Sequence, residues 1–206
     1  IYLLLYLKNR KKIFNYPRAR KKYSVSVAIP AYNEENTIKE TIRAVFSSHY
    51  PLKEVIVVND GSKDRTAEIV KRLMKKYPKL KLIDKPNSGK GDSLNKALKS
   101  AKGELFAVVD ADSFPSRDAL TKMVGYFDDK KVGAVTTVFI PRNTNNFIEK
   151  LQAIEYKIIA FTRKLLDYVD AVYVTPGPLA LYRKKALLQI GGFDSKNMTE
   201  DTVSYT

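Results

Sequence analysis

Val55-Ile-Val-Val-Asn-Asp-Gly-Ser-Lys-Asp-Arg-Thr66 is the stretch that decides the fold. Its four leading β-branched residues predict a buried strand at 55–58, and Asp64 is a good N-cap for a following helix. Beyond it, apolar residues recur at helical spacing, at Ile69, Val70, Leu73, Met74 and Tyr77. A strand, a polar loop and an amphipathic helix in this order form half of a β-α-β unit, the element that builds parallel sheets.

The same alternation continues in both directions along the chain. Further strands are expected at 25–29, 80–83, 105–109 and 132–139, and helices at 36–46, 92–100 and 116–127, the last capped by Ser116. After Pro141 we expect a longer amphipathic helix at 147–165, extended pieces at 172–174 and 179–182, and a helix at 184–190 closed by Gly191-Gly192. The pattern predicts an α/β fold, with helices flanking a Rossmann-like, mostly parallel sheet in one domain spanning residues 23–206.

The composition is that of a folded globular protein, since 44% of the 206 residues are hydrophobic and 29% are charged. The chain has no Cys, which excludes disulfides and thiolate metal sites. Its net charge of +15 is unevenly spread, because eight positive charges and no acid lie between Lys8 and Lys22, here called the basic stretch. A partner with negative charge is expected there.

The apolar run Ile1-Tyr-Leu-Leu-Leu-Tyr-Leu7 comes just before the basic stretch. Seven residues cannot cross a bilayer, which takes roughly 20 in a helix. Because the chain begins with Ile, we expect a cut-off run, and an apolar run followed by Lys and Arg is typical of the cytoplasmic end of a transmembrane helix. An exposed tail or a nucleic-acid-binding arm is the alternative, but no nucleic-acid motif is present. We therefore expect residues 1–22 to contact a membrane surface, with residues 23–206 on its cytoplasmic side and no nucleic-acid partner.

Asp110-Ala-Asp112 follows the expected strand at 105–109 directly. In open α/β sheets, ligands bind beyond the carboxyl ends of the strands. Two carboxylates at such an end can share Mg²⁺ or Mn²⁺ with a diphosphate. Two solvated acids that cap a turn are the plainer interpretation. A haloacid-dehalogenase nucleophile also sits in an Asp-x-Asp, but after the first strand rather than the fourth.

Gly89-Lys-Gly91 follows the third expected strand, where backbone N–H groups and a lysine can cradle phosphates. A flexible turn before a helix is the alternative. The full pattern of a P-loop NTPase requires Gly at position 84 and a hydroxyl at 91, and this chain has Asp84 and Gly91. The glycine fingerprint of nicotinamide dehydrogenases is absent after the first strand, which argues against that class.

Five motifs in this order resemble the family-2 glycosyltransferases, namely Pro30-Ala-Tyr-Asn-Glu34, Val57-Val-Asn-Asp-Gly-Ser62, Gly89-Lys-Gly91 with Leu94-Asn95, Asp110-Ala-Asp112 and Thr199-Glu-Asp201. The resemblance covers about Ser24 to Asp201 and is strongest to the processive membrane synthases of cellulose, chitin, hyaluronan and poly-N-acetylglucosamine. It implies the nucleotide-diphospho-sugar transferase fold, called GT-A, and a hexosyltransferase that moves sugar from a UDP-sugar to a glycan acceptor.

The resemblance also implies roles for single residues. The nucleotide would be contacted by Pro30, Tyr32, Glu34, Asp60, Lys90 and Asp110, with Asp60 at the uracil edge and Lys90 near the phosphates. Asp112, with Asp110, would hold the divalent cation, Mg²⁺ or Mn²⁺. Taken singly, each of these residues also has an ordinary structural interpretation, such as closing a turn or filling the core.

Asp201 would be the general base that deprotonates the acceptor hydroxyl, which is a poor nucleophile by itself. Direct displacement inverts the anomeric configuration. Pro176, Gly177 and Glu200 would lie on the acceptor side. The Gln-x-x-Arg-Trp motif of processive synthases is missing, since the chain has no Trp and ends at Thr206, and we expect a truncated chain. A single-addition transferase acting on a lipid phosphate, or a non-catalytic nucleotide-sugar-binding domain, is the alternative.

Overall fold

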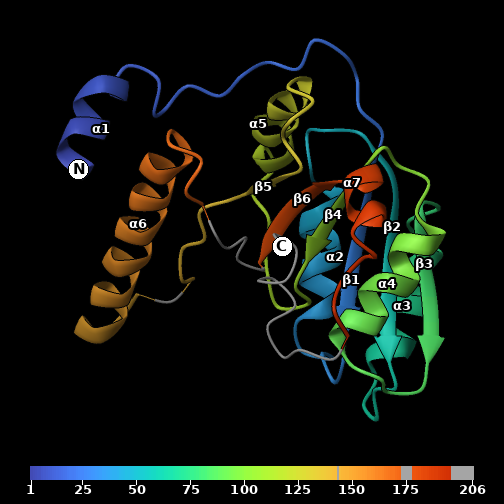
Figure 1. Cartoon of the computed structure of the whole chain (residues 1–206). Coiled ribbons are helices and arrows are strands. Elements are labelled where there is room, and N and C mark those ends of the chain that lie inside the picture. Colours follow the sequence, from blue (N-terminus) through green and yellow to red (C-terminus); the bar gives the residue numbers. More distant parts are fainter. Residues whose placement is uncertain (143, 173–177, 196–206) are drawn as a thin grey trace.

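A six-stranded sheet forms the centre of the computed structural model, which describes residues 1–142, 144–172 and 178–195 (Figure 1). The strand order is β3-β2-β1-β4-β6-β5. The strands are β1 (Val25–Ala31), β2 (Leu52–Asp60), β3 (Leu80–Lys85), β4 (Leu105–Val109), β5 (Ala134–Thr136) and β6 (Leu179–Arg183). The first four are parallel, whereas β6 runs antiparallel to both β4 and β5. The predicted α/β fold with a mostly parallel sheet is therefore confirmed.

Helices cover both faces of the sheet because its strands bury alternate residues on opposite sides. In β2, Val55 and Val57 belong to the cluster that packs with α2 (Ile38–Phe46), α3 (Thr66–Met74) and α5 (Ala119–Val124). Ile56 and Val58 face the opposite way, toward α4 (Lys90–Ser100) and α7 (Lys184–Gln189). The apolar run at 55–58 is thus buried on both faces, as a parallel strand requires.

Several element boundaries differ from the sequence expectation, among them those of α3, α5 and β5. Helix α3 begins at Thr66, and Asp64 accepts the Thr66 N–H at 3.0 Å from outside the helix. The helix expected at 116–127 is divided into α5 and a 3₁₀ turn, η1 (Gly125–Asp128). A Cβ on Gly125 would lie 1.8 Å from the carbonyl oxygen of Pro17, so a glycine there lets the N-terminal segment cross. The strand expected at 132–139 shrinks to β5, an edge strand that pairs with three residues of β6.

Two helices lie apart from the sheet in Figure 1, α1 (Tyr2–Asn9) and α6 (Phe147–Asp167). They pack side by side, with the ring centroids of Tyr6 and Phe161 5.9 Å apart. A capping box starts α6, because Asn146 accepts the Glu149 N–H at 2.8 Å while the Glu149 carboxylate accepts the Asn146 N–H at 3.3 Å. Among the described residues, no helix has the length and apolarity needed to span a membrane.

The second half of the basic stretch is fastened to the sheet domain. The Arg20 N–H donates to the Asp128 carboxylate at 2.6 Å, and the Lys21 ammonium pairs with Glu104 at 2.7 Å. The Tyr23 hydroxyl adds a bond to the Phe127 carbonyl at 2.8 Å. Residues 20–23, just before β1, are therefore held on the surface of the sheet domain.

Candidate active site

A cavity of about 390 Å³ opens beyond the carboxyl ends of β1, β2 and β4. This is the rim at which open α/β sheets bind their ligands. Six residues predicted to contact a nucleotide, and the predicted metal ligand Asp112, all line it: Pro30, Tyr32, Glu34, Asp60, Lys90, Asp110 and Asp112. The fold thus brings the four motifs between residues 30 and 112 to one place, although their individual roles stay predictions.

The loop after β1 is held in place by the loop after β2. The Asn33 backbone has a positive φ of 56°, and its N–H donates to the Ser62 hydroxyl at 2.9 Å. The Glu34 N–H donates to the Thr66 hydroxyl at 2.8 Å. These bonds leave the Tyr32 side chain 46% exposed at the mouth of the cavity, where its ring is available to a planar base.

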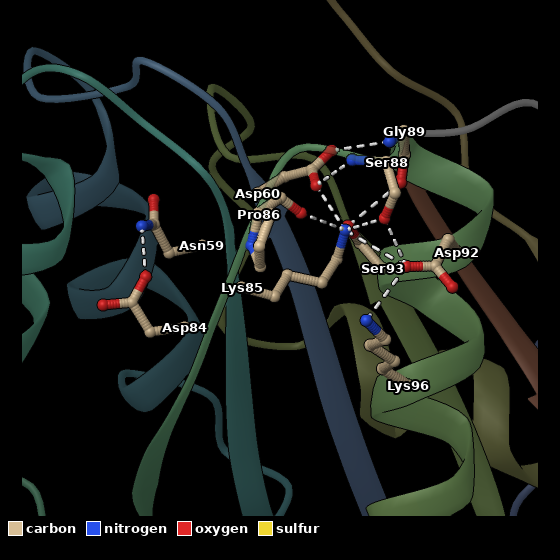
Figure 2. Close-up of polar contacts among 10 residues, drawn as sticks. All are labelled: Asn59, Asp60, Asp84, Lys85, Pro86, Ser88, Gly89, Asp92, Ser93 and Lys96. Carbon is tan, nitrogen blue, oxygen red and sulfur yellow. Dashed lines mark hydrogen bonds and ion pairs between the residues drawn. The ribbon is translucent and has the colours of Figure 1, made fainter.

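Asp60, the last residue of β2, lines the cavity and is only 4% exposed; Figure 2 shows its polar contacts. One carboxylate oxygen accepts the Ser88 N–H at 2.9 Å and a hydrogen bond from the Lys85 ammonium, and the other accepts the Gly89 N–H at 2.9 Å. A buried carboxylate needs such partners, because an unpaired one is very costly in a protein interior. Each oxygen can accept about two bonds, so the oxygen that accepts only the Gly89 N–H keeps one acceptor site.

Lys85 links Asp60 to helix α4. Its buried ammonium also donates to the Ser88 hydroxyl at 2.5 Å and pairs with Asp92 at 3.1 Å. The hydrogen bond from Ser88 and the ion pair with Lys85 lower the pKa of Asp92 to about 2. The network ends at the surface with Lys96, 3.3 Å from Asp92 (Figure 2).

The turn between β2 and α3 requires a glycine where it touches the loop after β3. Gly61 has a φ of 70°, in the left-handed region that favours glycine. A Cβ at this position would lie 2.6 Å from the backbone nitrogen of Asn87. Since Asn87 also lines the cavity, the Asp-Gly pair shapes the cavity wall as well as the turn.

The carboxylates of Asp110 and Asp112 are the candidate cation ligands. Asp110 follows β4 and pairs with the Lys90 ammonium at 3.0 Å, while Asp112 is exposed. Among the described residues, no group of three or more His, Cys, Asp or Glu side chains is placed to hold a metal. Two carboxylates nevertheless suit Mg²⁺, a hard cation usually held by one or two carboxylates together with substrate phosphates and waters. The donor set therefore fits a cation that arrives with a diphosphate.

A second, larger groove of about 2000 Å³ lies between α6 and the sheet domain. Asp112 lines both this groove and the smaller cavity, so the two adjoin at this residue. Aromatic and basic side chains take part in its walls; Arg142 lies over the Phe114 ring at 4.7 Å and bonds to Glu40 at 2.8 Å. Pro178 and Leu179 also line it.

Four predicted site residues, Pro176, Gly177, Glu200 and Asp201, lie outside the described residues. Conversely, sequence reasoning missed Lys85, which supports Asp60 from within a strand. The only signal in the sequence was a lysine at the end of an expected strand, and this signal is weak because lysines are common at the ends of exposed strands. It also missed Ser93, which lines the cavity one turn after the Gly-Lys-Gly sequence.

Solved structures share this architecture. The structure of the mannosyltransferase PcManGT from Pyrobaculum calidifontis in complex with GDP-Man and Mn²⁺ matches 98% of this chain and 58% of its own, with a TM-score of 0.75 and 28% identity. The structure of Staphylococcus aureus TarS 1–349 in complex with UDP matches 88% of this chain and 54% of its own, with a TM-score of 0.63 and 25% identity. The predicted GT-A type fold is confirmed.

Sequence comparison points the same way. The poly-beta-1,6-N-acetyl-D-glucosamine synthases of Staphylococcus epidermidis and S. aureus strain MSSA476 are 36% and 32% identical to this chain over 180 and 179 residues. Each match covers 86% of this chain and 43% of the relative, so the chain spans less than half the length of these curated relatives. Residues 26–191 match the sequence profile described as Glycosyl transferase family 2. The chain therefore belongs to glycosyl transferase family 2.

Proposed function

We propose that this chain is the catalytic domain of an inverting hexosyltransferase that moves a sugar from a UDP-sugar to a growing glycan with the help of a divalent cation. The observation that carries the proposal is the cavity at the carboxyl ends of β1, β2 and β4, which is lined by the buried carboxylate of Asp60 and by Asp110 and Asp112. The names of the relatives, which synthesise poly-N-acetylglucosamine, and the UDP complex of TarS support a uridine donor.

The base of the donor would lie between Tyr32 and Asp60. Asp60 is held by an ammonium and two backbone amides, which use three of its roughly four acceptor sites and leave one on the oxygen that accepts the Gly89 N–H. The uracil N3–H can donate a hydrogen bond to such a carboxylate. The GDP-Man complex of PcManGT makes GDP the natural competitor in a binding test.

The diphosphate would lie at the N-terminus of α4, whose free N–H groups and dipole favour negative charge. Lys90 is the first residue of that helix, and its ammonium is 3.0 Å from Asp110. Asp110 and Asp112 would hold the divalent cation, which offsets the charge that builds on the leaving nucleotide. Lys90 then exchanges part of its pairing with Asp110 for the phosphates.

The acceptor would enter through the larger groove, because Asp112 lines both this groove and the donor cavity. Its hydroxyl needs a base on the side opposite the leaving nucleotide, and Asp201 is the residue to which the family resemblance gives that role. A single displacement at the anomeric carbon inverts its configuration and needs no carboxylate nucleophile on the protein.

Membrane attachment is part of the proposal. Four positive charges of the basic stretch, between Lys8 and Lys12, lie at the end of α1, whose Leu3, Leu4 and Leu7 are at least half exposed. On α6, which packs against α1, Phe147, Ile148 and Ile158 are more than half exposed. Apolar side chains beside a cluster of Lys and Arg suit the surface of an anionic membrane, with the catalytic domain on the cytoplasmic side.

Calorimetric titration of UDP tests the donor half of the proposal. We expect binding that needs Mg²⁺ or Mn²⁺ and weakens in EDTA and in the Asp112→Ala variant, because the cation bridges protein and diphosphate. Asp118→Ala, which removes an acid outside the donor cavity whose side chain is 45% exposed, is the matched control and should bind as wild type does. Equal affinity with and without metal would remove the cation from the proposal.

The acceptor half is tested by the product formed by the intact enzyme. A glycan that lengthens with time supports the proposal. A single sugar on a lipid phosphate would favour the lipid-phosphate alternative. UDP binding without transfer in any assay would favour a non-catalytic nucleotide-sugar-binding domain.

A further inference from the structure

Asn95 and Phe193 are 98 residues apart in the sequence and meet through a pair of hydrogen bonds. The Asn95 side-chain amide donates to the Phe193 carbonyl at 2.8 Å, and the Phe193 N–H donates to the Asn95 side-chain oxygen at 2.8 Å. One side chain thus satisfies both backbone groups of a single residue, as a neighbouring strand would. We call this pair of bonds the Asn95 clamp.

The turn that follows α7 lies directly on α4, and both points of contact require glycine. Gly192 has a φ of 90°, and a Cβ there would lie 2.4 Å from the Asn95 side-chain oxygen. Gly91, near the start of α4, would place a Cβ 2.8 Å from the Asp194 carbonyl oxygen. The backbone of the turn at 191–195 therefore approaches the helix more closely than any residue with a side chain allows.

The Phe193 ring anchors the turn in the core independently of the clamp. It is buried, with its centroid 5.6 Å from that of Tyr182 in an edge-on arrangement and 6.3 Å from that of Phe106. Asn95 itself is only partly buried. Loss of the Asn95 amide therefore removes the two bonds that fix the turn and leaves the hydrophobic anchor in place.

The two ends of this arrangement belong to different parts of the proposed reaction. Lys90 and Ser93, which precede Asn95 on α4 by five and two residues, line the donor cavity. The turn at 191–195 leads to Asp201, six residues after Ser195, a reach of at most about 22 Å for an extended chain.

We propose that Asn95 is a positioning residue, which fixes the turn at 191–195 against α4 so that the chain continuing to Asp201 starts from a set point relative to the donor cavity. The inference rests on the proposed role of Asp201 as the base. It gives the Leu94-Asn95 and Gly191-Gly-Phe-Asp194 sequences a shared role, which is to fix the start of the chain that leads to Asp201 relative to the donor cavity.

The test compares Asn95→Ala and Asn95→Asp with the control Lys99→Ala, which changes an exposed residue of the same helix. Asn95→Asp is nearly isosteric and keeps the acceptor for the Phe193 N–H, but it sets a carboxylate oxygen against the Phe193 carbonyl. Three quantities are measured: hydrogen exchange at the Phe193 amide, the Kd for UDP, and kcat and KM for transfer by the intact enzyme.

We expect faster exchange at the Phe193 amide in Asn95→Ala, an unchanged Kd for UDP in both Asn95 variants, and a kcat lowered by about 10²-fold, the usual effect of a displacement of about 1 Å near a reacting group. Lys99→Ala should match wild type throughout. Unchanged exchange in Asn95→Ala would overturn the clamp. Faster exchange with wild-type kcat would make the clamp structural only and overturn the positioning role.

A large loss of UDP affinity in the Asn95 variants would also overturn the positioning role, because Asn95 would then belong to the donor site. Absence of transfer by the wild-type enzyme is a different result. It would contradict the proposed function, and with it the positioning role, while the exchange measurement would still decide whether the clamp itself exists.

Discussion

Replacement of Lys85 by methionine leaves the carboxylate of Asp60 buried without its cation. The two side chains are 4% and 6% exposed, so solvent cannot take over the pairing. Removing one partner of a buried ion pair generally costs about 3–5 kcal/mol. The Ser88 and Gly89 amides still contact the carboxylate, so we expect a loss near the lower end, about 3 kcal/mol. For a chain of this length, that corresponds to a fall in Tm of about 6–12 °C.

The matched control is Lys96→Met, the same substitution at the exposed end of the same network. The Lys96 ammonium lies 3.3 Å from Asp92 with its side chain 45% exposed, and such pairs contribute under about 1 kcal/mol. Thermal and urea denaturation followed by circular dichroism gives both values. The double variant Lys85→Met/Asp60→Asn carries no lone buried charge, so it should recover part of the stability that Lys85→Met loses.

Two results would refute the reasoning. If Lys85→Met and Lys96→Met lose the same small amount of stability, the Lys85–Asp60 pair is not desolvated. If the double variant is no more stable than Lys85→Met, an uncompensated buried charge is not the cause of the loss.

Three further outcomes are expected. Asp60→Ala should reduce the preference for UDP over GDP in competition binding by about 1–3 kcal/mol, the cost of one missing bond to a buried group; an unchanged preference would place base recognition elsewhere. The pKa of Asp92 is lowered from 3.8 to about 2 in the folded state, so its ionised form stabilises the fold above about pH 4 and this contribution is lost as the pH falls toward 2. Wild type should therefore lose stability more steeply than Asp92→Asn over that window, and parallel curves would contradict the shift. Charge-neutral variants of the basic stretch should sediment less with anionic liposomes, because each charge removed weakens the binding free energy by about 1 kcal/mol. The difference should fade at high salt, and equal sedimentation would make the stretch a solvated tail.

Much of the fold could be predicted because its parallel strands are buried on both faces. Such strands appear as continuous apolar runs, and β4 (Leu105–Val109) has the predicted bounds. Predictions were weaker where tertiary contacts decide the local structure. Gly125, where α5 gives way to η1, lies against Pro17, more than 100 residues away in the sequence, and no local sequence pattern predicts that contact.

The candidate site could be predicted wherever a strand end carries its own polar motif. The loops after β1, β2 and β4 meet at one rim because parallel strands share a direction, so Tyr32, Asp60 and Asp110 had to converge. The partners of Asp60 could not be predicted, because the pairing of Lys85 with Asp60 depends on the register between β2 and β3, in which the two residues lie opposite each other. The Asn95 clamp could not be predicted either, because Asn95 and Phe193 are 98 residues apart in the sequence.

Transfer of a labelled sugar from a UDP-sugar to a glycan acceptor by the intact enzyme, measured together with UDP affinity in wild type and Asp201→Asn, tests the central claim most directly. The substitution keeps the shape of the side chain and removes its capacity to take a proton. We expect transfer to fall by about 10²–10⁴-fold, the usual contribution of a general base, while UDP binds as before, since the donor cavity is built from residues 30–112. Transfer that stays within a few-fold of wild type, or a parallel loss of UDP binding, would contradict the account.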